Sequence, residues 1–312
     1  MSRVGAIDCG TNSIRLLIAE TGDSLLRDVH REMRIVRLGQ GVDATGQFAP
    51  EALARTRAAL SDYADLLRSH DVERIRMVAT SAARDVSNRE EFFAMTADLL
   101  GAVQPGAVAE VISGAQEAEL SFNGAVAELD SAAGPFVVVD LGGGSTEVVL
   151  GDTGVLAGHS ADIGCVRLTE RFLHSDPPTA VEVAAARELV REKLGEAFRA
   201  VPVESAATWV GLAGTFTTVA ALAKRMTTYD ADAIHLSTVT FGDLLPVCDE
   251  LVGMTRAGRA ALGPMHEGRV DVIGGGAIVV QELARALGTR AGIDSLVVSE
   301  HDILDGIALS LA

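Results

Sequence analysis

The chain has 312 residues, of which 48% are hydrophobic, and its 26 Lys and Arg against 43 Asp and Glu give a formal net charge of −17. This length is expected to form two domains, and the apolar content is sufficient for packed cores rather than disorder. So acidic a protein is a poor general binder of nucleic acid or of anionic membranes, and no apolar run approaches the roughly 20 residues of a membrane span.

The three cysteines, Cys9, Cys165 and Cys248, are odd in number and far apart. This pattern fits a reducing compartment better than a disulfide framework, and the start of the chain leaves no room for a signal peptide. The sequence therefore predicts a cytoplasmic protein. Cys9 is interpreted as a small core residue rather than a reactive thiol.

The charge is unevenly distributed along the chain. Residues 1–90 hold 13 basic and 13 acidic residues, whereas residues 91–166 contain no Lys or Arg. If the ligand is a polyanion, its attraction must come from a metal ion and from arginines in the first third of the chain.

The first predicted element is a β-hairpin over residues 4–18. Its first strand ends at Asp8, the turn contains Gly10, and the hydrogen-bonding side chains of Thr11, Asn12 and Ser13 precede the second strand. A strand over 25–36, a helix over 50–70 and a buried strand over 74–79 follow.

A polar segment, residues 80–85, comes directly after the strand over 74–79. Open α/β sheets bind ligands at the carboxyl ends of their strands. Arg84 in this segment is therefore either a clamp for a phosphate or a surface residue paired with Asp85, and the local sequence leaves both open.

A helix over 92–100 and a strand over 108–112 lead to a further helix, for which Ser113 is the expected N-cap and Gln116 completes a capping-box spacing. Acids in a first helical turn usually interact with the helix dipole, which is the ordinary interpretation of Glu117 and Glu119. Glu117 has a second interpretation, as a functional acid, because it lies just beyond a strand end.

The strongest local signal is a second hairpin over residues 136–150. An apolar strand ends in Asp140, turns through Gly142, Gly143 and Gly144, and resumes after Ser145, Thr146 and Glu147. Residues without side chains let backbone N–H groups approach an anion, and the two acids can hold a divalent cation directly or through water. The stretch predicts a combined phosphate and metal site.

The two hairpins repeat one plan at a constant offset of 132 residues, which aligns Asp8 with Asp140 and Gly10 with Gly142. Arg15 falls opposite Glu147, so the copies share a scaffold but differ in charge. One glycine-rich hairpin is a weak signal, whereas two at a constant offset indicate a duplicated domain.

The remaining elements are expected as a strand over 155–160, helices over 166–173 and 179–200, helices over 243–251, 255–262 and 270–287, a strand over 292–298 and a closing helix over 301–311. Residues 209–218 read as a strand, a glycine turn and a helix start, which is either a third ligand wall or ordinary capping by Thr215. No histidine pair has a metal-ligand spacing, and no Walker A motif or nucleophile elbow is present.

Taken together, the sequence resembles the exopolyphosphatase/guanosine-pentaphosphate phosphatase (Ppx/GppA) family of the actin/hexokinase/Hsp70 superfamily. The motifs that carry the resemblance occur in the family's order over essentially the whole chain. They are Asp8-Cys9-Gly10-Thr11-Asn12-Ser13, Ala79-Thr80-Ser81-Ala82-Ala83-Arg84-Asp85, Ile112-Ser113-Gly114-Ala115-Gln116-Glu117-Ala118, the stretch from Asp140 to Glu147, and Gly211-Leu212-Ala213-Gly214-Thr215.

The resemblance implies an α/β fold of two ribonuclease-H-like (actin-like ATPase) domains with the active site in the cleft between them. The expected first domain is 1–125, with a C-terminal helix over 300–312 that returns to it, and the expected second domain is 126–299. Family habit also suggests a homodimer.

The implied reaction is hydrolysis of a terminal phosphoanhydride with Mg²⁺, or Mn²⁺ in its place, releasing orthophosphate. Glu117 falls on the family's base, which activates the attacking water. Asp140 and Glu147 match its metal- and water-positioning acids, Asp8 is a further metal candidate, and Arg84 would clamp an anionic oxygen. The phosphates would be held by Thr11, Asn12, Ser13, Gly142, Gly143, Gly144, Ser145 and Thr146.

Two departures from the family pattern bear on function. Leu304-Asp305-Gly306 replaces the family's Arg-Glu-Gly, which puts a role for that arginine in doubt. Longer relatives carry extra helical domains that help to hold long polyphosphate, so this chain is expected to be less processive and to favour shorter chains.

The substrate is expected to be inorganic polyphosphate, with pppGpp as the alternative that the sequence cannot separate. Two other functions stay open: an ATP-dependent phosphotransferase on the same fold, for which no acceptor signature is visible, and a non-catalytic sensor of polyphosphate or a nucleotide. The intact Glu117, Asp140 and Glu147 count against the sensor.

Overall fold

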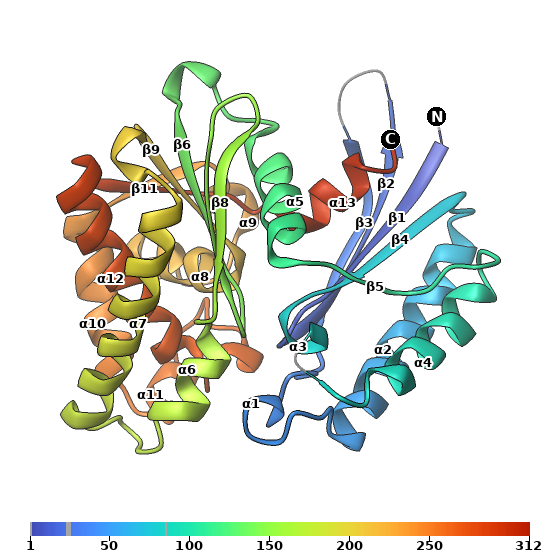
Figure 1. The fold of residues 1–312 in the computed structure, drawn as a ribbon, viewed down its shortest axis with the longest axis horizontal. Coiled ribbons are helices and arrows are strands. Elements are labelled where there is room, and N and C mark those ends of the chain that lie inside the picture. The colour runs from blue at the N-terminus through green and yellow to red at the C-terminus, as the bar shows by residue number, and fades with distance from the viewer. Residues whose placement is uncertain (1, 23–25, 85) are drawn as a thin grey trace. The chain divides into compact units, whose positions relative to one another are not determined.

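A computed structural model of the protein describes residues 2–22, 26–84 and 86–312. The chain divides into two compact units, one formed by Met1–Gly124 with Ile303–Ala312 and the other by Ala125–Asp302. Each unit contains a β-sheet with helices packed against it (Figure 1). The expected α/β class is confirmed.

The sheet of the first unit has the strand order β3-β2-β1-β4-β5. Its strands are β1 (Ser2–Cys9), β2 (Ser13–Thr21), β3 (Leu26–Ile35), β4 (Arg74–Ala79) and β5 (Glu110–Val111). The strands β1 to β3 are antiparallel neighbours, whereas β4 and β5 are added in parallel.

Side chains on alternating positions of these strands serve two separate cores. Ile7 and Leu16 face the helices α2 (Pro50–Ser69) and α4 (Arg89–Gly101). Ala6 and Leu17 belong to the core on the other face, with α13 (Ile303–Leu309) and Leu120 of α5 (Gly114–Val126). Figure 1 shows the red α13 beside the blue strands from the other end of the chain. The short helices α1 (Val42–Thr45) and α3 (Ser81–Arg84) complete the unit.

The sheet of the second unit has the order β10-β11-β9-β6-β7-β8. Its strands are β6 (Phe136–Leu141), β7 (Thr146–Gly151), β8 (Val155–Ala161), β9 (Thr208–Leu212), β10 (Ser237–Thr240) and β11 (Ser295–Val298). Without the added edge strand β10, this order repeats that of the first sheet, strand for strand. Both sheets thus have the ribonuclease-H-like arrangement that the resemblance implied.

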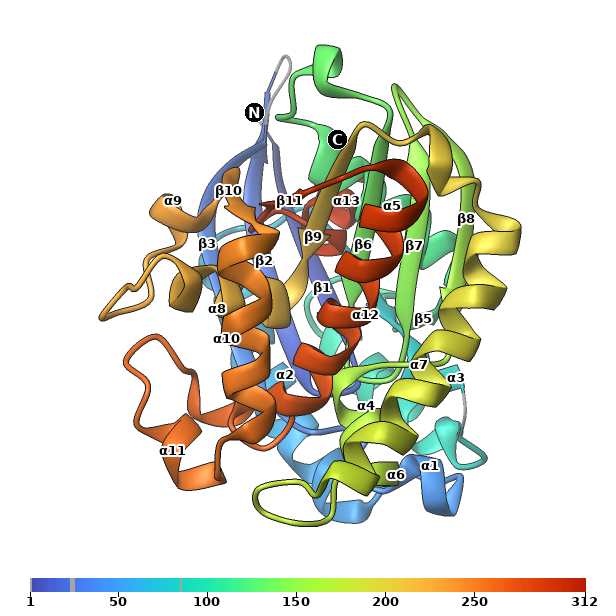
Figure 2. The ribbon, with the colours of Figure 1, turned by 90° about the vertical axis from the view of Figure 1, so that its left-hand side faces the viewer.

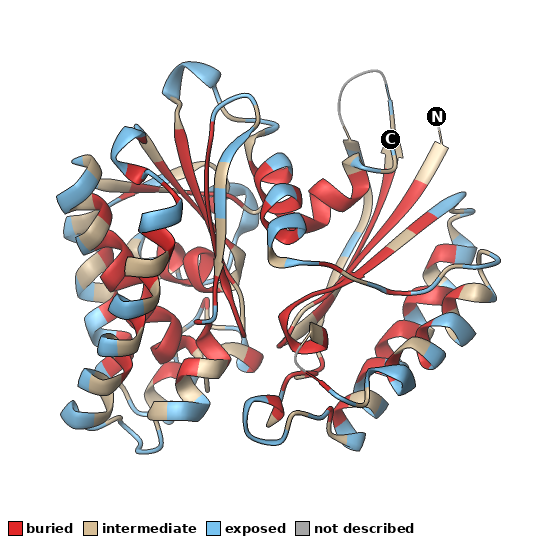
Figure 3. Ribbon diagram, viewed as in Figure 1, coloured by how far each residue is buried: buried red, intermediate tan, exposed pale blue. Residues whose placement is uncertain are grey.

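The helices of the second unit are α6 (Cys165–Phe172), α7 (Ala180–Ala200), α8 (Ala213–Ala223), α9 (Ala231–Ile234), α10 (Phe241–Gly253), α11 (Arg256–Ala260) and α12 (Ile273–Ala291). Figure 2 shows α7, α10 and α12 in front of this sheet, and Figure 3 shows that their inner faces and the central strands are buried. The glycines at the start of α12 serve close packing, because a Cβ on Gly275 or Gly276 would lie 2.6 Å from the hydroxyl oxygen of Thr169 or Thr215.

Most predicted elements are confirmed within a few residues, including Pro50 at the start of α2 and the Ser113–Gln116 capping box of α5. The strand expected over 108–112 is only two residues long, and α9 and β10 were missed. The start of the strand expected over 25–36 lies outside the described residues.

The three cysteines are buried and form no disulfide. Burial raises the pKa of the Cys9 thiol far above its usual value, with Asp8 adding to the effect, and it raises the pKa of Cys165 to about 11. These thiols are therefore core residues, as predicted for Cys9. Among the described residues, no helix has the length and apolar character that a membrane crossing requires.

Candidate active site

The two glycine-bearing turns have the same backbone hydrogen bond. The N–H of Gly10 donates to the carbonyl of Ser13 at 2.9 Å, and the N–H of Gly142 donates to the carbonyl of Ser145 at 3.0 Å. These residues are related by the 132-residue offset found in the sequence. The duplication of the hairpin is therefore confirmed at the level of the individual hydrogen bond.

The backbone of the second turn is fixed by the start of α6. The carbonyl oxygens of Gly142 and Gly143 accept from the N–H groups of Cys165 and Val166 at 3.0 and 2.9 Å. Since the C=O and N–H of a trans peptide point in opposite directions, the N–H groups of Gly143 and Gly144 point away from α6. The turn thus presents successive amide donors, as a phosphate-binding loop requires.

Gly164 allows this close contact between α6 and the turn. A Cβ at this position would lie 2.4 Å from the carbonyl carbon of Gly143 and 2.6 Å from the nitrogen of Gly144. A side chain here would displace the turn, so Gly164 is a positioning residue that sequence reasoning missed.

The carboxylates of Asp140 and Glu147 lie on directly paired positions of β6 and β7. Both residues are almost completely buried, with exposed fractions of 7% and 1%, and Glu147 accepts a hydrogen bond of 2.6 Å from the Ser160 hydroxyl. Like charges on opposed positions of neighbouring strands repel each other. A divalent cation bound by these oxygens would offset the repulsion, which fits the predicted metal site.

The equivalent pair in the first unit has opposite charges. Asp8 is paired with Arg15 across β1 and β2, and its Oδ2 accepts from Nη2 and Nε of Arg15 at 2.7 and 3.0 Å. The charge of Asp8 is thus balanced by protein, whereas the copy in the second unit brings two acids together. Two carboxylates on paired positions offer more of the oxygen ligands that divalent cations prefer than Asp8 alone does.

Glu117 in the first turn of α5 is 7% exposed, and its Oε2 accepts from Nη1 of Arg84 at 2.8 Å. The same guanidinium nitrogen donates to the carbonyl of Ile112 at 3.0 Å, so Arg84 is fixed against the end of β5. Burial raises the pKa of Glu117 above its usual value, and nearby Asp8 adds to the rise, while Arg84 and Thr80 oppose it. A buried carboxylate with a raised pKa is suited to accept a proton near neutral pH.

The pairing of Arg84 with Glu117 was not anticipated from the sequence. The alternatives considered there were a phosphate clamp and a pair with Asp85, and Asp85 lies outside the described residues. Arg84 follows β4 and Glu117 follows β5, and these strands are parallel neighbours, so the two residues meet at one edge of the sheet. A strand-order prediction would have been needed to find this pair.

The predicted hydroxyl and amide ligands differ in their surroundings. Asn12 and Ser13 are half-buried, Thr11 is buried beside Gly39, and Ser145 is buried in the turn. Thr146 is fully buried, and its hydroxyl donates to the carbonyl of Ile163 at 2.6 Å. The side chain of Thr146 therefore holds the turn together, and a role of this residue as a donor to phosphate stays a prediction.

The turn between β9 and α8 lies at the same sheet edge as residues 142–145, because β6 and β9 are parallel and Asp140 is level with Leu212. Ala213 in this turn has a left-handed φ of 71°, which is strained for a residue with a Cβ. The guanidinium of Arg269 packs on Gly214, and its Nη1 donates to Thr218 at 2.9 Å. Arg269, which the sequence did not indicate as a site residue, therefore places a positive charge beside residues 209–218, the segment interpreted as a ligand wall or as ordinary capping.

Another group of metal-ligating side chains occurs in the second unit, formed by Glu128, His235 and His301. Nδ1 of His235 accepts from the N–H of Glu300 at 3.2 Å, which places the proton of the neutral ring on Nε2, 3.1 Å from Glu128 Oε2. His235 and Glu128 are thus joined by a hydrogen bond, and Nδ1 of His301 lies 3.5 Å from Glu128 Oε1. The histidines are far apart in sequence, so no spacing signal predicted their meeting.

Comparison with known proteins places the chain among phosphatases. A model of the Ppx/GppA phosphatase family matches residues 17–311. The protein named exopolyphosphatase 2 of Mycobacterium tuberculosis is 73% identical over an alignment that covers 100% of this chain and 99% of the relative. The resemblance inferred from the sequence motifs is confirmed.

Solved structures agree with this assignment. The crystal structure of an exopolyphosphatase-like protein is 42% identical, covers 99% of this chain and 98% of its own, and superposes with a TM-score of 0.94. The Ppx/GppA family member of Aquifex aeolicus is 32% identical, with coverage of 99% and 97% and a TM-score of 0.81.

Proposed function

Because the chain belongs to the Ppx/GppA phosphatase family, we propose that it is an exopolyphosphatase, which hydrolyses the terminal phosphoanhydride of inorganic polyphosphate and releases orthophosphate. The observation that carries the proposal is the opposed pair Asp140 and Glu147 beside the outward amides of Gly143 and Gly144. Phosphoryl transfer to water needs positioning and charge neutralisation more than covalent chemistry, and this arrangement offers both. The name of the M. tuberculosis relative supports the same substrate.

The metal would be held by the carboxylates of Asp140 and Glu147. Hard oxygen ligands suit Mg²⁺, with Mn²⁺ as the alternative ion. The bound ion would neutralise phosphate charge, which an acidic protein otherwise repels. Asp8 is not assigned as a direct ligand in this proposal, because its ion pair with Arg15 already balances its charge.

Glu117 acts as the general base in this proposal: its carboxylate orients a water molecule and accepts its proton as the oxygen attacks the terminal phosphorus. The raised pKa of Glu117 supports this role. Arg84 holds the carboxylate in position and donates from its remaining N–H groups to a phosphate oxygen.

Further donors to the phosphates are Asn12, Ser13 and Ser145, with Thr11 and the backbone of Gly142 and Thr146 shaping the turns. The proposal includes a preference for short polyphosphate chains, because a net charge of −17 repels the distal part of a long polyanion. We also propose that the protein works in the cytoplasm as a homodimer, which sedimentation of the purified protein would test.

The decisive experiment measures orthophosphate release by the purified protein with short polyphosphate, long polyphosphate, pppGpp and ATP, in Mg²⁺, in Mn²⁺ and with a chelator. Glu117→Gln should lower kcat by about 10²- to 10⁴-fold, the usual contribution of a general base. The matched control is Glu119→Gln, which makes the same change on an exposed position of the same helix and should keep wild-type activity.

The outcomes separate the candidate functions. Preferred release from polyphosphate supports the proposal, whereas preferred release from pppGpp would make the protein a pppGpp 5′-phosphohydrolase. Tight binding without release would indicate a sensor, and equal processive digestion of long chains would overturn the short-chain preference. Activity that survives in the chelator would contradict the metal site.

A further inference from the structure

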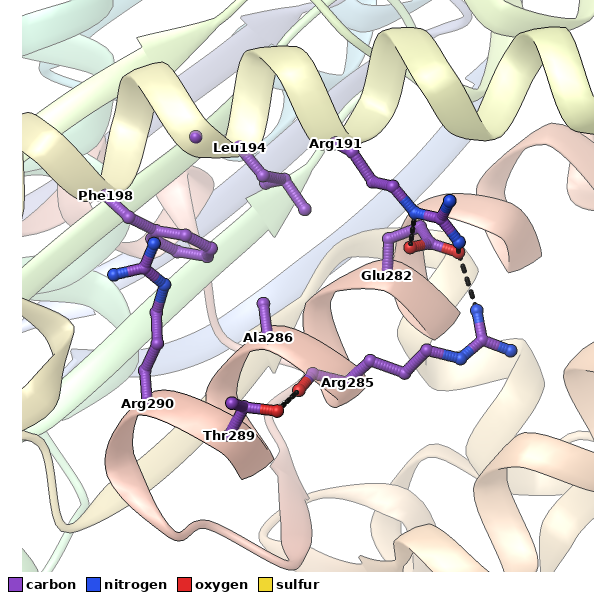
Figure 4. Close-up of a pocket in the computed structure, with 9 residues that line it drawn as sticks. Arg191, Leu194, Phe198, Glu282, Arg285, Ala286, Thr289 and Arg290 are labelled. Carbon is purple, nitrogen blue, oxygen red and sulfur yellow. Dashed lines mark hydrogen bonds and ion pairs between the residues drawn. The ribbon is translucent and has the colours of Figure 1, made fainter.

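A pocket of about 350 Å³ lies on the second unit between α7 and α12 (Figure 4), and none of its lining residues belongs to the turn of residues 142–145. The helix α7 contributes Arg191, Leu194, Gly195 and Phe198, and α12 contributes residues from Glu282 to Arg290. On each helix these positions are three or four residues apart, so the pocket is the groove between two facing helical stripes. Its volume is within the range of small-molecule sites, which begins at roughly 300 Å³.

The groove gathers arginines around a single buried carboxylate. Glu282, which is 4% exposed, accepts from Arg187 Nη1 at 2.7 Å, from Arg191 Nε at 2.7 Å and from Arg285 Nη1 at 2.6 Å. Figure 4 shows the side chains of Arg191 and Arg285 converging on Glu282. Three guanidinium groups on one carboxylate leave an excess of positive charge, in a protein whose net charge is −17.

These cations are accessible. The side chains of Arg191 and Arg285 are 63% and 44% exposed. Arg290, at the other end of the pocket, is 42% exposed and lies over the ring of Phe198 at 5.2 Å, and its Nη1 donates to Glu204 at 2.8 Å. Arg187, the third arginine on Glu282, is less exposed, at 18%. The other arginines can therefore bind an anion from solvent.

The hollow between them includes open space beside Gly195. A Cβ at Gly195 would meet only Nη1 of Arg199, at 3.9 Å, so close helix packing does not demand the glycine. By contrast, a Cβ on Gly274, Gly275 or Gly276 at the start of α12 would lie 2.6 to 3.0 Å from the nearest neighbouring atom. Glycine inside a helix costs about 1 kcal/mol relative to alanine, so open space rather than packing accounts for it here.

We propose that this pocket binds a small anion that carries two or more phosphoryl groups, held by Arg191, Arg285 and Arg290. Guanidinium groups match phosphate oxygens in a bidentate manner. The separation of Arg290 from the Arg191–Arg285 pair, with Leu194 and Ala286 between them, favours a ligand longer than a single phosphate (Figure 4). This site does not depend on the activity proposed above.

The test is calorimetric titration of the full-length protein with inorganic diphosphate, in a chelator so that metal-dependent binding at the candidate active site is suppressed. Wild-type protein should bind. Arg285→Gln, which leaves Arg187 and Arg191 on Glu282, should weaken binding by at least about tenfold, the effect of losing one charged hydrogen bond. The control Lys224→Gln removes one exposed positive charge outside the pocket and should change affinity by less than twofold.

A second variant tests the pocket without altering its charge. Gly195→Leu fills the hollow, should abolish diphosphate binding, and should keep or raise the melting temperature because leucine favours helix. Parallel titrations with ADP and with inorganic triphosphate distinguish the source of the phosphoryl groups, and binding of either at least as tight as diphosphate supports the site. The proposal would be overturned if wild-type protein did not bind diphosphate, or if Arg285→Gln and Gly195→Leu bound it as tightly as wild type. It would also be overturned if sulfate and citrate bound as tightly as diphosphate.

Discussion

Glu117 remains buried although burial disfavours its charged form. An acid whose pKa is raised by folding destabilises the folded state increasingly as pH rises from the acid's ordinary pKa through its raised value. Such destabilisation by a buried charge is typical of functional carboxylates, which are selected for reactivity rather than stability.

We therefore expect Glu117→Gln to be inactive yet more stable than wild type at pH 8, because glutamine retains an oxygen acceptor for Arg84 without a buried charge. The melting temperature of the variant should exceed that of wild type at pH 8, and the difference should shrink toward pH 4. Glu119→Gln, on the exposed side of the helix, should leave the melting temperature unchanged. A lower melting temperature for Glu117→Gln at pH 8 would contradict the pKa argument.

Arg84 lowers the pKa of Glu117 by its charge and by its hydrogen bond. Arg84→Gln should therefore raise the pKa of Glu117 further and move the acid limb of the kcat/KM profile to higher pH, in addition to lowering kcat/KM by about tenfold or more through lost phosphate contacts. The pH profile of polyphosphate hydrolysis measures both effects.

The control for this shift is Arg89→Gln, an exposed arginine at the start of α4. It should leave the acid limb in place. If the limb also stays in place in Arg84→Gln while kcat/KM falls, Arg84 contacts only substrate and does not tune the base.

At the scale of elements, α13 is the segment that closes the first unit. Asp305 of α13 accepts from both terminal nitrogens of Arg31 on β3, at 2.5 and 3.2 Å, and Asp305 is buried. Gly306 lies against α5, where a Cβ would come within 2.0 Å of the carbonyl oxygen of Leu120. Asp305, which departs from the family pattern, and Gly306, which keeps it, thus both have a packing role.

Arg31→Met should lower the free energy of unfolding by about 2 to 3 kcal/mol, because it removes a bidentate partner from a buried carboxylate. Arg27→Met is the matched control, since Arg27 is a 72% exposed residue of the same strand in a surface ion pair, and it should cost less than about 1 kcal/mol. Denaturant unfolding measures both values. If both variants lowered the free energy of unfolding equally, apolar packing rather than the Arg31–Asp305 ion pair would hold α13 on the sheet.

At the scale of the whole molecule, the net charge of −17 opposes the approach of a polyanionic substrate. Raising monovalent salt from about 0.01 to 0.1 M shortens the screening length from roughly 30 to 10 Å. At constant free Mg²⁺, kcat/KM for polyphosphate should then rise by a factor of about two to three, while kcat at saturation stays constant because repulsion acts on encounter. Steady-state kinetics across this range is the check, and a steep fall would mean that local arginines dominate the encounter.

The sequence by itself determined the α/β class, the duplicated hairpins and the candidate groups on them. These features depend on local sequence, since both strands that end in Asp-x-Gly are followed by the same hydrogen-bonded turn. The constant offset of 132 residues between the two hairpins indicated the duplication. The order of the strands followed from the family resemblance rather than from local pattern.

Only the tertiary structure decided which side chains meet across the sheets and helices. Arg84 and Glu117 are 33 residues apart, Arg187 and Glu282 are 95 apart, and Arg31 and Asp305 are 274 apart. Such contacts depend on which strands and helices become neighbours, and no local spacing encodes them. The sequence therefore predicted the chemistry of the candidate active site, while the partner of its base and the arginine pocket between α7 and α12 became visible only in the folded chain.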